Sequence, residues 1–284
     1  PTLHGITFAP VRRMFRFSCK VLATTIVNHV NNNVLNILLG HYFSPHDTGN
    51  FNQAYQWNMK SYSLVQSMIL QVAQPVLVGL DDDADRQLRV FRKMVRFTSF
   101  VTFPLLFGFA LVSREFIVIA LTEKWLASAS LLQLLCISGA VMPLCALFNN
   151  MVVSKGRSDI LLWCTFSLGL LLTLMMLVIW PWGIHVMVVA FVVINVSWLF
   201  VWLYFVRRLT GYGYLMFVRD VLPFAIAAVA VMSLTYFATQ SIQNLWILLL
   251  SRIAIAATAY YAVMRVAHVA ILDECIDFIR GKMK

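Results

Sequence analysis

The chain has 284 residues, of which 61% are hydrophobic and 12% are charged, and its mean hydropathy is +0.80. Soluble domains carry about 25% charged residues, so this composition excludes a soluble globular protein and predicts an all-α integral membrane protein. The formal net charge of +10 does not call for nucleic acid as a partner, because basic loops of membrane proteins lie against anionic lipid.

Eight apolar windows are each long enough to cross a hydrocarbon core of about 30 Å. They are predicted at residues 17–39, 52–79, 97–121, 126–153, 160–181, 184–206, 221–240 and 245–267. Eight crossings place both ends of the chain on one side of the membrane. The positive-inside rule makes that side cytoplasmic, since only Arg114, Lys124 and Arg252 then lie outside, and Lys60 lies within a helix.

The first predicted helix carries a line of polar side chains. Thr25, Asn28, Asn32 and Asn36 follow one another at helical spacing, with His29 beside them. Such a face in a membrane protein meets water, a substrate or another helix. The asparagines are also interpretable as hydrogen-bonding contacts between helices, and the histidine as a packed side chain, a proton carrier or a ligand.

The second predicted helix carries a longer polar face. Its members follow at steps of three and four residues, which keeps them on one side of a helix; they are Gln53, Gln56, Lys60, Ser63, Ser67, Gln71 and Gln74. Together with the first helix, this face predicts the wall of a wet cavity. Lys60 lies deep for snorkelling, and the sequence shows no interior carboxylate to pair with it. Its expected partner is a substrate phosphate, and the alternative is a packing or snorkelling role.

Aspartates precede the third crossing. Residues 81–96 are predicted to form a short amphipathic helix on the cytoplasmic leaflet, with ion pairs one turn apart such as Asp85 with Arg89. Asp81, Asp82 and Asp85 also match the DDxxD pattern that binds magnesium diphosphate in membrane prenyltransferases. Such enzymes need a second acidic cluster, and the sequence has none. Helix capping and ion pairing are therefore the preferred interpretation.

The sequence contains no other recognisable catalytic or metal-binding pattern. No Ser-His-Asp set, glycine-rich phosphate loop or pair of interior carboxylates is found, and the five cysteines have neither metal-ligand spacing nor positions suited to an external disulfide. We therefore predict no catalytic residue, no metal and no cofactor. The chain begins at Pro1 without the short apolar core of a signal peptide, which indicates an internal fragment.

Five short stretches occur in an order that resembles a known transporter family. They are residues 33–40 (NVLNILLG), 49–56 (GNFNQAYQ), 122–126 (TEKWL), 131–144 (LLQLLCISGAVMPL) and 154–159 (SKGRSD). This order resembles the Wzx-type polysaccharide flippases of the multidrug/oligosaccharidyl-lipid/polysaccharide exporter superfamily. One departure is Gln53, where many relatives carry Arg, and it shifts the expected anion-binding role to Lys60.

The resemblance implies a protein of fourteen helices, with two six-helix lobes around a central cavity followed by two extra helices. This chain would supply the C-terminal lobe and the extra helices, and the N-terminal lobe would be missing. The expected divisions are a cytoplasmic lead-in at 1–16, a six-helix lobe at 17–206, a cytoplasmic loop at 207–220, two additional transmembrane helices at 221–267 and a cytoplasmic tail at 268–284.

The implied function is the flipping of an undecaprenyl-diphosphate-linked oligosaccharide across the bacterial inner membrane by alternating access, for lipopolysaccharide (O-antigen) or exopolysaccharide synthesis. Expected partners are that lipid-linked oligosaccharide, membrane lipids, the missing lobe and polysaccharide polymerase machinery. The residues expected to bind the substrate are Lys60, Gln53, Gln56, Asn28, His29, Asn32, Asn36, Ser63, Ser67 and Gln71. Amides and hydroxyls would bind sugar hydroxyls, and Lys60 would bind the diphosphate.

Two alternatives stay open on the sequence alone. A multidrug cation antiporter of the same superfamily needs interior carboxylates for cation and proton binding, and none is recognisable. A membrane prenyl- or acyltransferase needs a metal and a second acidic or histidine site. The sugar structure of the substrate and the coupling ion, proton or sodium, are open as well.

Overall fold

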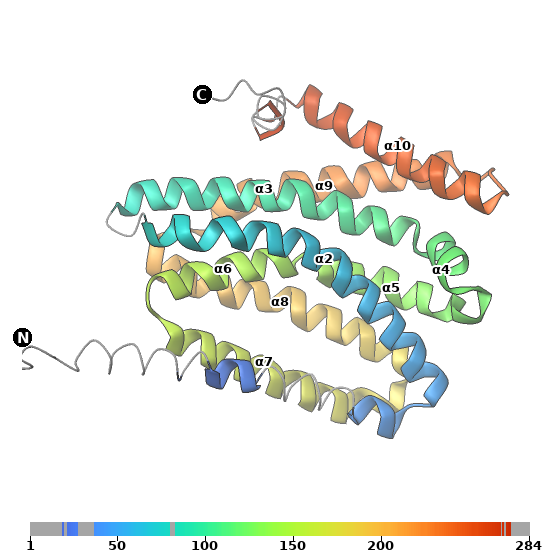
Figure 1. The fold of residues 1–284 in the computed structure, drawn as a ribbon, viewed down its shortest axis with the longest axis horizontal. Helices are drawn as coiled ribbons and strands as arrows, with labels where there is room; N and C mark the ends of the chain where they lie inside the picture. The colour runs from blue at the N-terminus through green and yellow to red at the C-terminus, as the bar shows by residue number, and fades with distance from the viewer. Residues whose placement is uncertain are drawn as a thin grey trace, which may run out of the picture.

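A computed structural model describes residues 19, 22–27, 37–79, 83–267, 269 and 271–273. The described residues form helices and no strand, which confirms the predicted all-α class (Figure 1). The elements in chain order are α2 (Pro45–Gly79), α3 (Ala84–Leu111), α4 (Ser113–Leu121), η2 (Glu123–Trp125), α5 (Leu126–Gly139), α6 (Met142–Ser154), α7 (Ser158–Ile179), η3 (Trp180–Trp182), α8 (Ile184–Thr210), α9 (Tyr214–Ala238) and α10 (Leu245–Val266).

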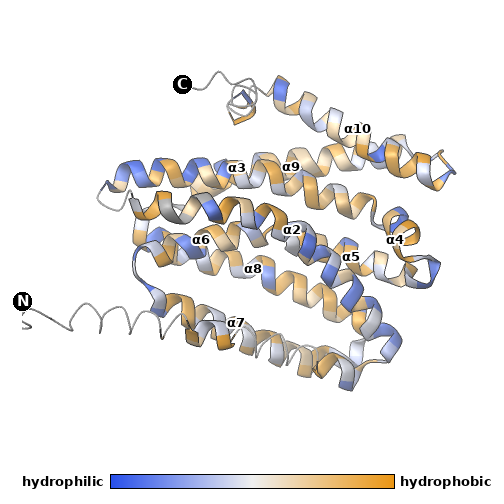
Figure 2. Ribbon diagram, viewed as in Figure 1, coloured by the Kyte–Doolittle hydropathy of each residue, from blue (hydrophilic) through white to orange (hydrophobic). Residues whose placement is uncertain are grey.

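Six segments within the described residues are long and apolar enough to cross a membrane. They are Ala84–Leu111, Glu123–Ser154, Ser158–Trp182, Ile184–Thr210, Tyr214–Ala238 and Leu245–Val266. Helix α2 is not among them, and Figure 2 shows hydrophilic residues recurring along it between apolar ones. Most of the first predicted window, 17–39, lies outside the described residues. The multi-pass membrane class is thus confirmed, whereas the count of eight crossings is not.

The segment predicted to form a separate surface helix is instead the beginning of α3. This helix runs without a break from Ala84 to Leu111, and the chain is interrupted only at Val112, before α4. The apolar side of the segment does not lie on a lipid surface, because Phe91 and Val95 are fully buried in the bundle. Burial against neighbouring helices extends the helix well beyond the apolar window that the sequence shows.

One of the aspartates before α3, Asp83, caps its N-terminus. The Asp83 carboxylate accepts a hydrogen bond from the backbone N–H of Arg86 at 2.9 Å, which caps the helix. The predicted pair between Asp85 and Arg89 is not among the ion pairs of the described residues. Asp81 and Asp82 lie outside the described residues.

The helices pack as a bundle with α2, α5, α6 and α8 side by side (Figure 1). Helix α2 packs on α5, α6 and α3, and α8 packs on α5, α6 and α7. Helices α9 and α10 join the bundle through α3, with α10 also touching α4. The rings of Phe91, Phe148 and Tyr212 meet where α3, α6 and the α8–α9 connection converge, with centroids 5.3–6.1 Å apart. This arrangement leaves one side of α2 uncovered by the described helices.

Candidate functional site

The polar face predicted on α2 is exposed along most of its length. Gln53 is half-buried, and the exposed members are Gln56, Lys60, Ser63, Ser67 and Gln71. Leu64 and Met68 are exposed among them, at 63% and 67%, so the face is polar with apolar interruptions. The predicted cavity residues of the first helix, Asn28, His29, Asn32 and Asn36, lie outside the described residues.

Lys60 lies near the middle of the 35-residue helix α2. Its Nζ atom is 4.5 Å from the centroid of the Trp57 ring, one turn earlier, and that ring contacts Phe116 of α4 edge-on at 4.8 Å. Such a cation–π contact contributes about 0.5–1 kcal/mol at an exposed site. Lys60 forms no ion pair with any described residue. An aromatic ring therefore positions this cation, and no described carboxylate neutralises it.

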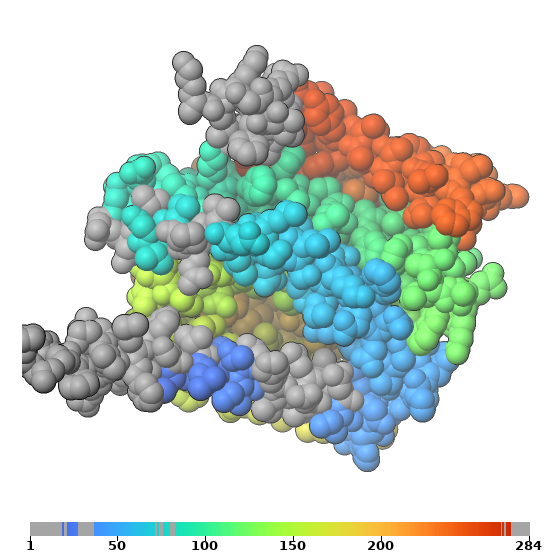
Figure 3. All heavy atoms as spheres, viewed as in Figure 1, coloured from blue at the N-terminus to red at the C-terminus, as the bar shows by residue number. Residues whose placement is uncertain are grey.

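A groove of about 600 Å³ opens beside this face, between α2 and α6. Its α2 wall includes Ser63 and Ser67, and its α6 wall includes Asn149, while Trp202 of α8 forms part of its floor. Figure 3 shows the surface recessed beside α2, where α6 and α8 lie deeper. Ser63 and Ser67 are thus the two predicted residues that line the groove. Lys60 lies one turn before Ser63, on the same exposed face.

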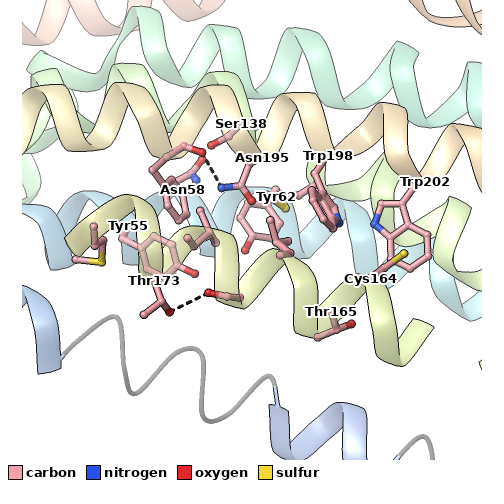
Figure 4. A pocket seen from close by; sticks show the side chains of 16 residues that line it. Tyr55, Asn58, Tyr62, Ser138, Cys164, Thr165, Thr173, Asn195, Trp198 and Trp202 are labelled. Atoms are coloured by element: carbon pink, nitrogen blue, oxygen red, sulfur yellow. Dashed lines mark hydrogen bonds between the residues drawn. The ribbon is translucent and has the colours of Figure 1, made fainter. Parts of the chain in front are cut away.

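A smaller cavity of about 210 Å³ continues inward between α2, α7 and α8 (Figure 4). Tyr62, Met142 and Trp202 line both spaces, so the groove and the cavity adjoin. Tyr55 and Asn58 extend from α2 into the cavity, which α8 faces with Asn195, Trp198 and Trp202.

Three buried polar atoms along these two spaces have no hydrogen-bond partner among the described residues. They are the Oδ1 atoms of Asn58 and Asn149 and the indole Nε1 of Trp198. Leaving a buried donor or acceptor unpaired costs about 1–3 kcal/mol, so these atoms carry hydrogen-bonding capacity that no described residue satisfies and that water or a ligand is able to satisfy. Both acceptors and a donor are present, which suits a ligand rich in hydroxyl groups.

The position of Asn58 depends on a glycine of the facing helix. A Cβ atom at Gly139 of α5 would lie 2.2 Å from Asn58 Oδ1, so any larger residue there would displace the amide. Asn195 is fixed differently, since its Nδ2 donates to the carbonyl of Phe191 at 2.8 Å (Figure 4). The two amides therefore lie in set positions on opposite walls of the cavity.

None of the residues that line the inner cavity was predicted from the sequence as a substrate-binding residue. Asn58, Tyr62 and Gln66 form their own i, i+4, i+8 line on α2, adjacent to the predicted stripe. Asn149 and Asn195 are amides within strongly apolar segments, which is a signal of function or of helix contact. Spacing alone does not show which of two adjacent polar lines faces a neighbouring helix.

Two interior carboxylates correct the expectation that the helices contain none. Asp220 is fully buried and accepts hydrogen bonds from Arg92 Nε at 2.9 Å and Arg96 Nε at 2.6 Å. Glu115 is 3% exposed and pairs with Arg252 at 2.9 Å. Neither carboxylate lines the α2 groove or its inner cavity. In the described part of the chain, no three His, Cys, Asp or Glu side chains are grouped to hold a metal.

Tyr212 completes the Asp220 cluster. Its hydroxyl donates to Asp220 Oδ2 at 3.3 Å. Burial, together with the Asp220 charge, raises the pKa of the tyrosine well above its usual value. The phenol therefore stays neutral and remains a hydrogen-bond donor at physiological pH. The bidentate Arg92 contact, the Arg96 contact and this phenol saturate the carboxylate.

The sequence comparisons agree on one family. Residues 3–130 match the family described as polysaccharide biosynthesis protein. This match covers less than half of the chain, so it shows a similarity to that family in the first part of the chain. This confirms the resemblance to polysaccharide flippases that the sequence motifs indicated.

Two named relatives carry related descriptions. The lipopolysaccharide biosynthesis protein WzxC of Escherichia coli is 28% identical over 56% of this chain, and the match covers 32% of WzxC. The teichuronic acid biosynthesis protein TuaB of Bacillus subtilis is 29% identical over 53% of this chain and 31% of its own length. The matched part of the chain therefore spans about a third of the length of these two relatives.

The fold has a solved counterpart. The lipid II flippase MurJ, in an inward closed conformation, superposes with a TM-score of 0.71 at 14% identity. The superposition covers 89% of this chain and 53% of MurJ. This establishes a flippase-like fold for the chain, and the partial coverage fits the expectation of the C-terminal part of a larger protein.

Proposed function

We propose that the protein containing this chain flips an undecaprenyl-diphosphate-linked oligosaccharide across the bacterial inner membrane by alternating access. The observation that carries the proposal is the groove beside α2, where exposed hydroxyls adjoin buried polar atoms that have no partner within the described chain. Carbohydrate hydroxyls both donate and accept hydrogen bonds, so they are able to satisfy the Asn58, Asn149 and Trp198 atoms. The family match and the flippase-like fold support transport rather than catalysis.

Lys60 is proposed to bind the diphosphate of this substrate. The ammonium group lies on the exposed face of α2, beside Ser63 of the groove, and its charge has no carboxylate partner in the described chain. A polar head group that crosses the membrane needs its negative charge compensated away from bulk water. We further propose that both chain ends are cytoplasmic, that the missing lobe closes the cavity and that the remaining polar residues of α2 bind sugar.

No observation favours the two other candidates. An antiporter would use interior carboxylates for cations, but Asp220 and Glu115 are each paired with arginine and lie away from the groove. A transferase would use Asp81, Asp82 and Asp85 with a metal, and of these only Asp85 lies within the described residues.

The test compares two lysines that each lie over a tryptophan. Lys60→Gln in the full-length protein should weaken binding of the lipid-linked oligosaccharide by roughly 10- to 150-fold, because a hydrogen bond to a charged group contributes about 1.5–3 kcal/mol. Lys60→Arg should retain part of the binding. The control is Lys124→Gln, which removes an exposed lysine 5.9 Å from the Trp125 ring, outside the groove.

The measurement is binding of the lipid-linked oligosaccharide to purified protein, together with accumulation of that intermediate in cells. The control should bind and transport as the parent does. If Lys60→Gln binds and transports normally at normal expression, Lys60 has only a packing role and the diphosphate assignment is wrong.

A further inference from the structure

A second groove, of about 280 Å³, lies between α3, α9 and α10, apart from the α2 groove. Its walls are mainly apolar and include Phe224 and Ala227 of α9, Met264 of α10 and Ile271. Two arginines, Arg96 and Arg219, line the same groove. The groove is therefore amphipathic, with cationic groups and apolar walls in one space.

The positive charge at this groove exceeds the negative charge. Arg92 and Arg96 both bind Asp220, so one carboxylate faces two guanidinium groups. The Arg96 side chain is still 45% exposed. Arg219 is exposed and forms no ion pair with any described residue. The surplus charge is available to an anion, and guanidinium groups bind phosphate oxygens in a bidentate geometry.

The groove lies near the beginning of α9 and the end of α10. Arg219 is in the second turn of α9, and Met264 is in the last turn of α10. Pro223, four residues after Arg219, also lines the groove and leaves the Arg219 carbonyl without its helical N–H partner. In a membrane-spanning helix, the terminal turns lie near the lipid head groups and the following turns face the acyl chains.

We propose that this groove binds one anionic phospholipid of the surrounding bilayer. Its phosphate would contact Arg96 and Arg219, and one acyl chain would lie against Phe224, Ala227 and Met264. An acyl chain in the groove would bury its apolar walls away from water. The two arginines would favour a head group with net negative charge. The Asp220 cluster positions Arg96 and so couples lipid binding to the contact between α3 and α9.

The experiment measures retention of dioleoylphosphatidylglycerol by the purified 284-residue chain in detergent, using native mass spectrometry. The parent chain should retain one molecule and prefer it at least about tenfold over dioleoylphosphatidylcholine. The Arg96→Gln/Arg219→Gln variant should lose this preference, and Arg219→Gln alone should lower affinity by about tenfold. Arg219 has no described ion-pair partner, so the single variant does not disturb the Asp220 cluster.

A matched control removes two arginines elsewhere. Arg207→Gln/Arg208→Gln deletes two exposed cations that lie over Tyr214 and Tyr204, outside the groove, and should retain the lipid. Filling the groove with Ala227→Phe should weaken retention while both arginines remain. The proposal is wrong if the control variant loses the lipid as the groove variants do, or if the groove variants retain it. Displacement of the lipid by inorganic phosphate would also overturn it, because the groove would then be a simple anion site.

Discussion

The groove beside α2 and the junction of α3 and α4 with α9 and α10 place charged side chains in opposite situations. At the junction, Asp220 and Glu115 are buried and each is held by arginine. Beside α2, Lys60 has no described carboxylate partner, and Asn58 Oδ1 and Trp198 Nε1 are buried without a hydrogen bond to any described residue. Both regions lie in apolar helices, so composition does not separate them.

The difference separates groups that hold helices together from groups that are free to meet a ligand. A buried charge is tolerated when a partner from another helix compensates it, and removing one partner is then costly. A buried polar atom left unpaired costs about 1–3 kcal/mol of stability, and a ligand that satisfies it recovers that cost on binding. Variants in the two regions should therefore affect stability and transport in opposite proportions.

The largest effect on stability is expected at Asp220. Asp220→Asn leaves Arg92 and Arg96 near a neutral amide, and should lower the free energy of unfolding toward the upper end of about 3–5 kcal/mol. Asp159→Asn is the control, because the Arg157–Asp159 pair is largely exposed and should contribute about 0–1 kcal/mol. Chemical denaturation in detergent measures both, and equal losses would show that the buried cluster does not hold α3 against α9.

A smaller loss is expected at the second buried pair. Arg252→Gln leaves Glu115 without its cation and should cost about 3 kcal/mol, the lower end of that range, because the pair borders a polar pocket of about 550 Å³. Replacing both partners, as Glu115→Leu/Arg252→Met, should restore most of the stability, since no buried charge then remains unpaired. Thermal unfolding of the single and double variants tests this. A double variant less stable than Arg252→Gln would contradict it.

The smallest change in stability is expected in the inner cavity, with a larger change in substrate binding. Trp198→Phe removes a buried N–H that has no partner among the described residues. This gain offsets the loss of ring volume, so stability should stay within about 0.5 kcal/mol of the parent, while affinity for the lipid-linked oligosaccharide falls by about tenfold. Trp163→Phe on α7, where the residue is 66% exposed, is the matched control and should change neither. Normal substrate binding by Trp198→Phe would show that the indole N–H does not contact the substrate.

The sequence by itself determined the class of the protein and the helical faces of α2. An apolar chain with few charges has to satisfy its backbone hydrogen bonds within helices when it spans a membrane, so composition was enough for the all-α class. The exposed polar face of α2 followed from the spacing of Gln56, Lys60 and Ser67, because helical periodicity depends only on positions along one helix. The motifs likewise indicated the similarity to polysaccharide biosynthesis proteins that the comparisons found.

Only the tertiary structure decided which polar residues are paired and which are open to a ligand. Asp220 meets Arg92 across 128 positions of sequence, and neither residue carries a local signal of the other. The same holds for the inner cavity, since Asn58 faces it only because Gly139 of α5 lets the two helices approach closely. Helix periodicity fixes a residue's direction around its own axis, whereas the neighbour on that side is chosen by packing between distant segments.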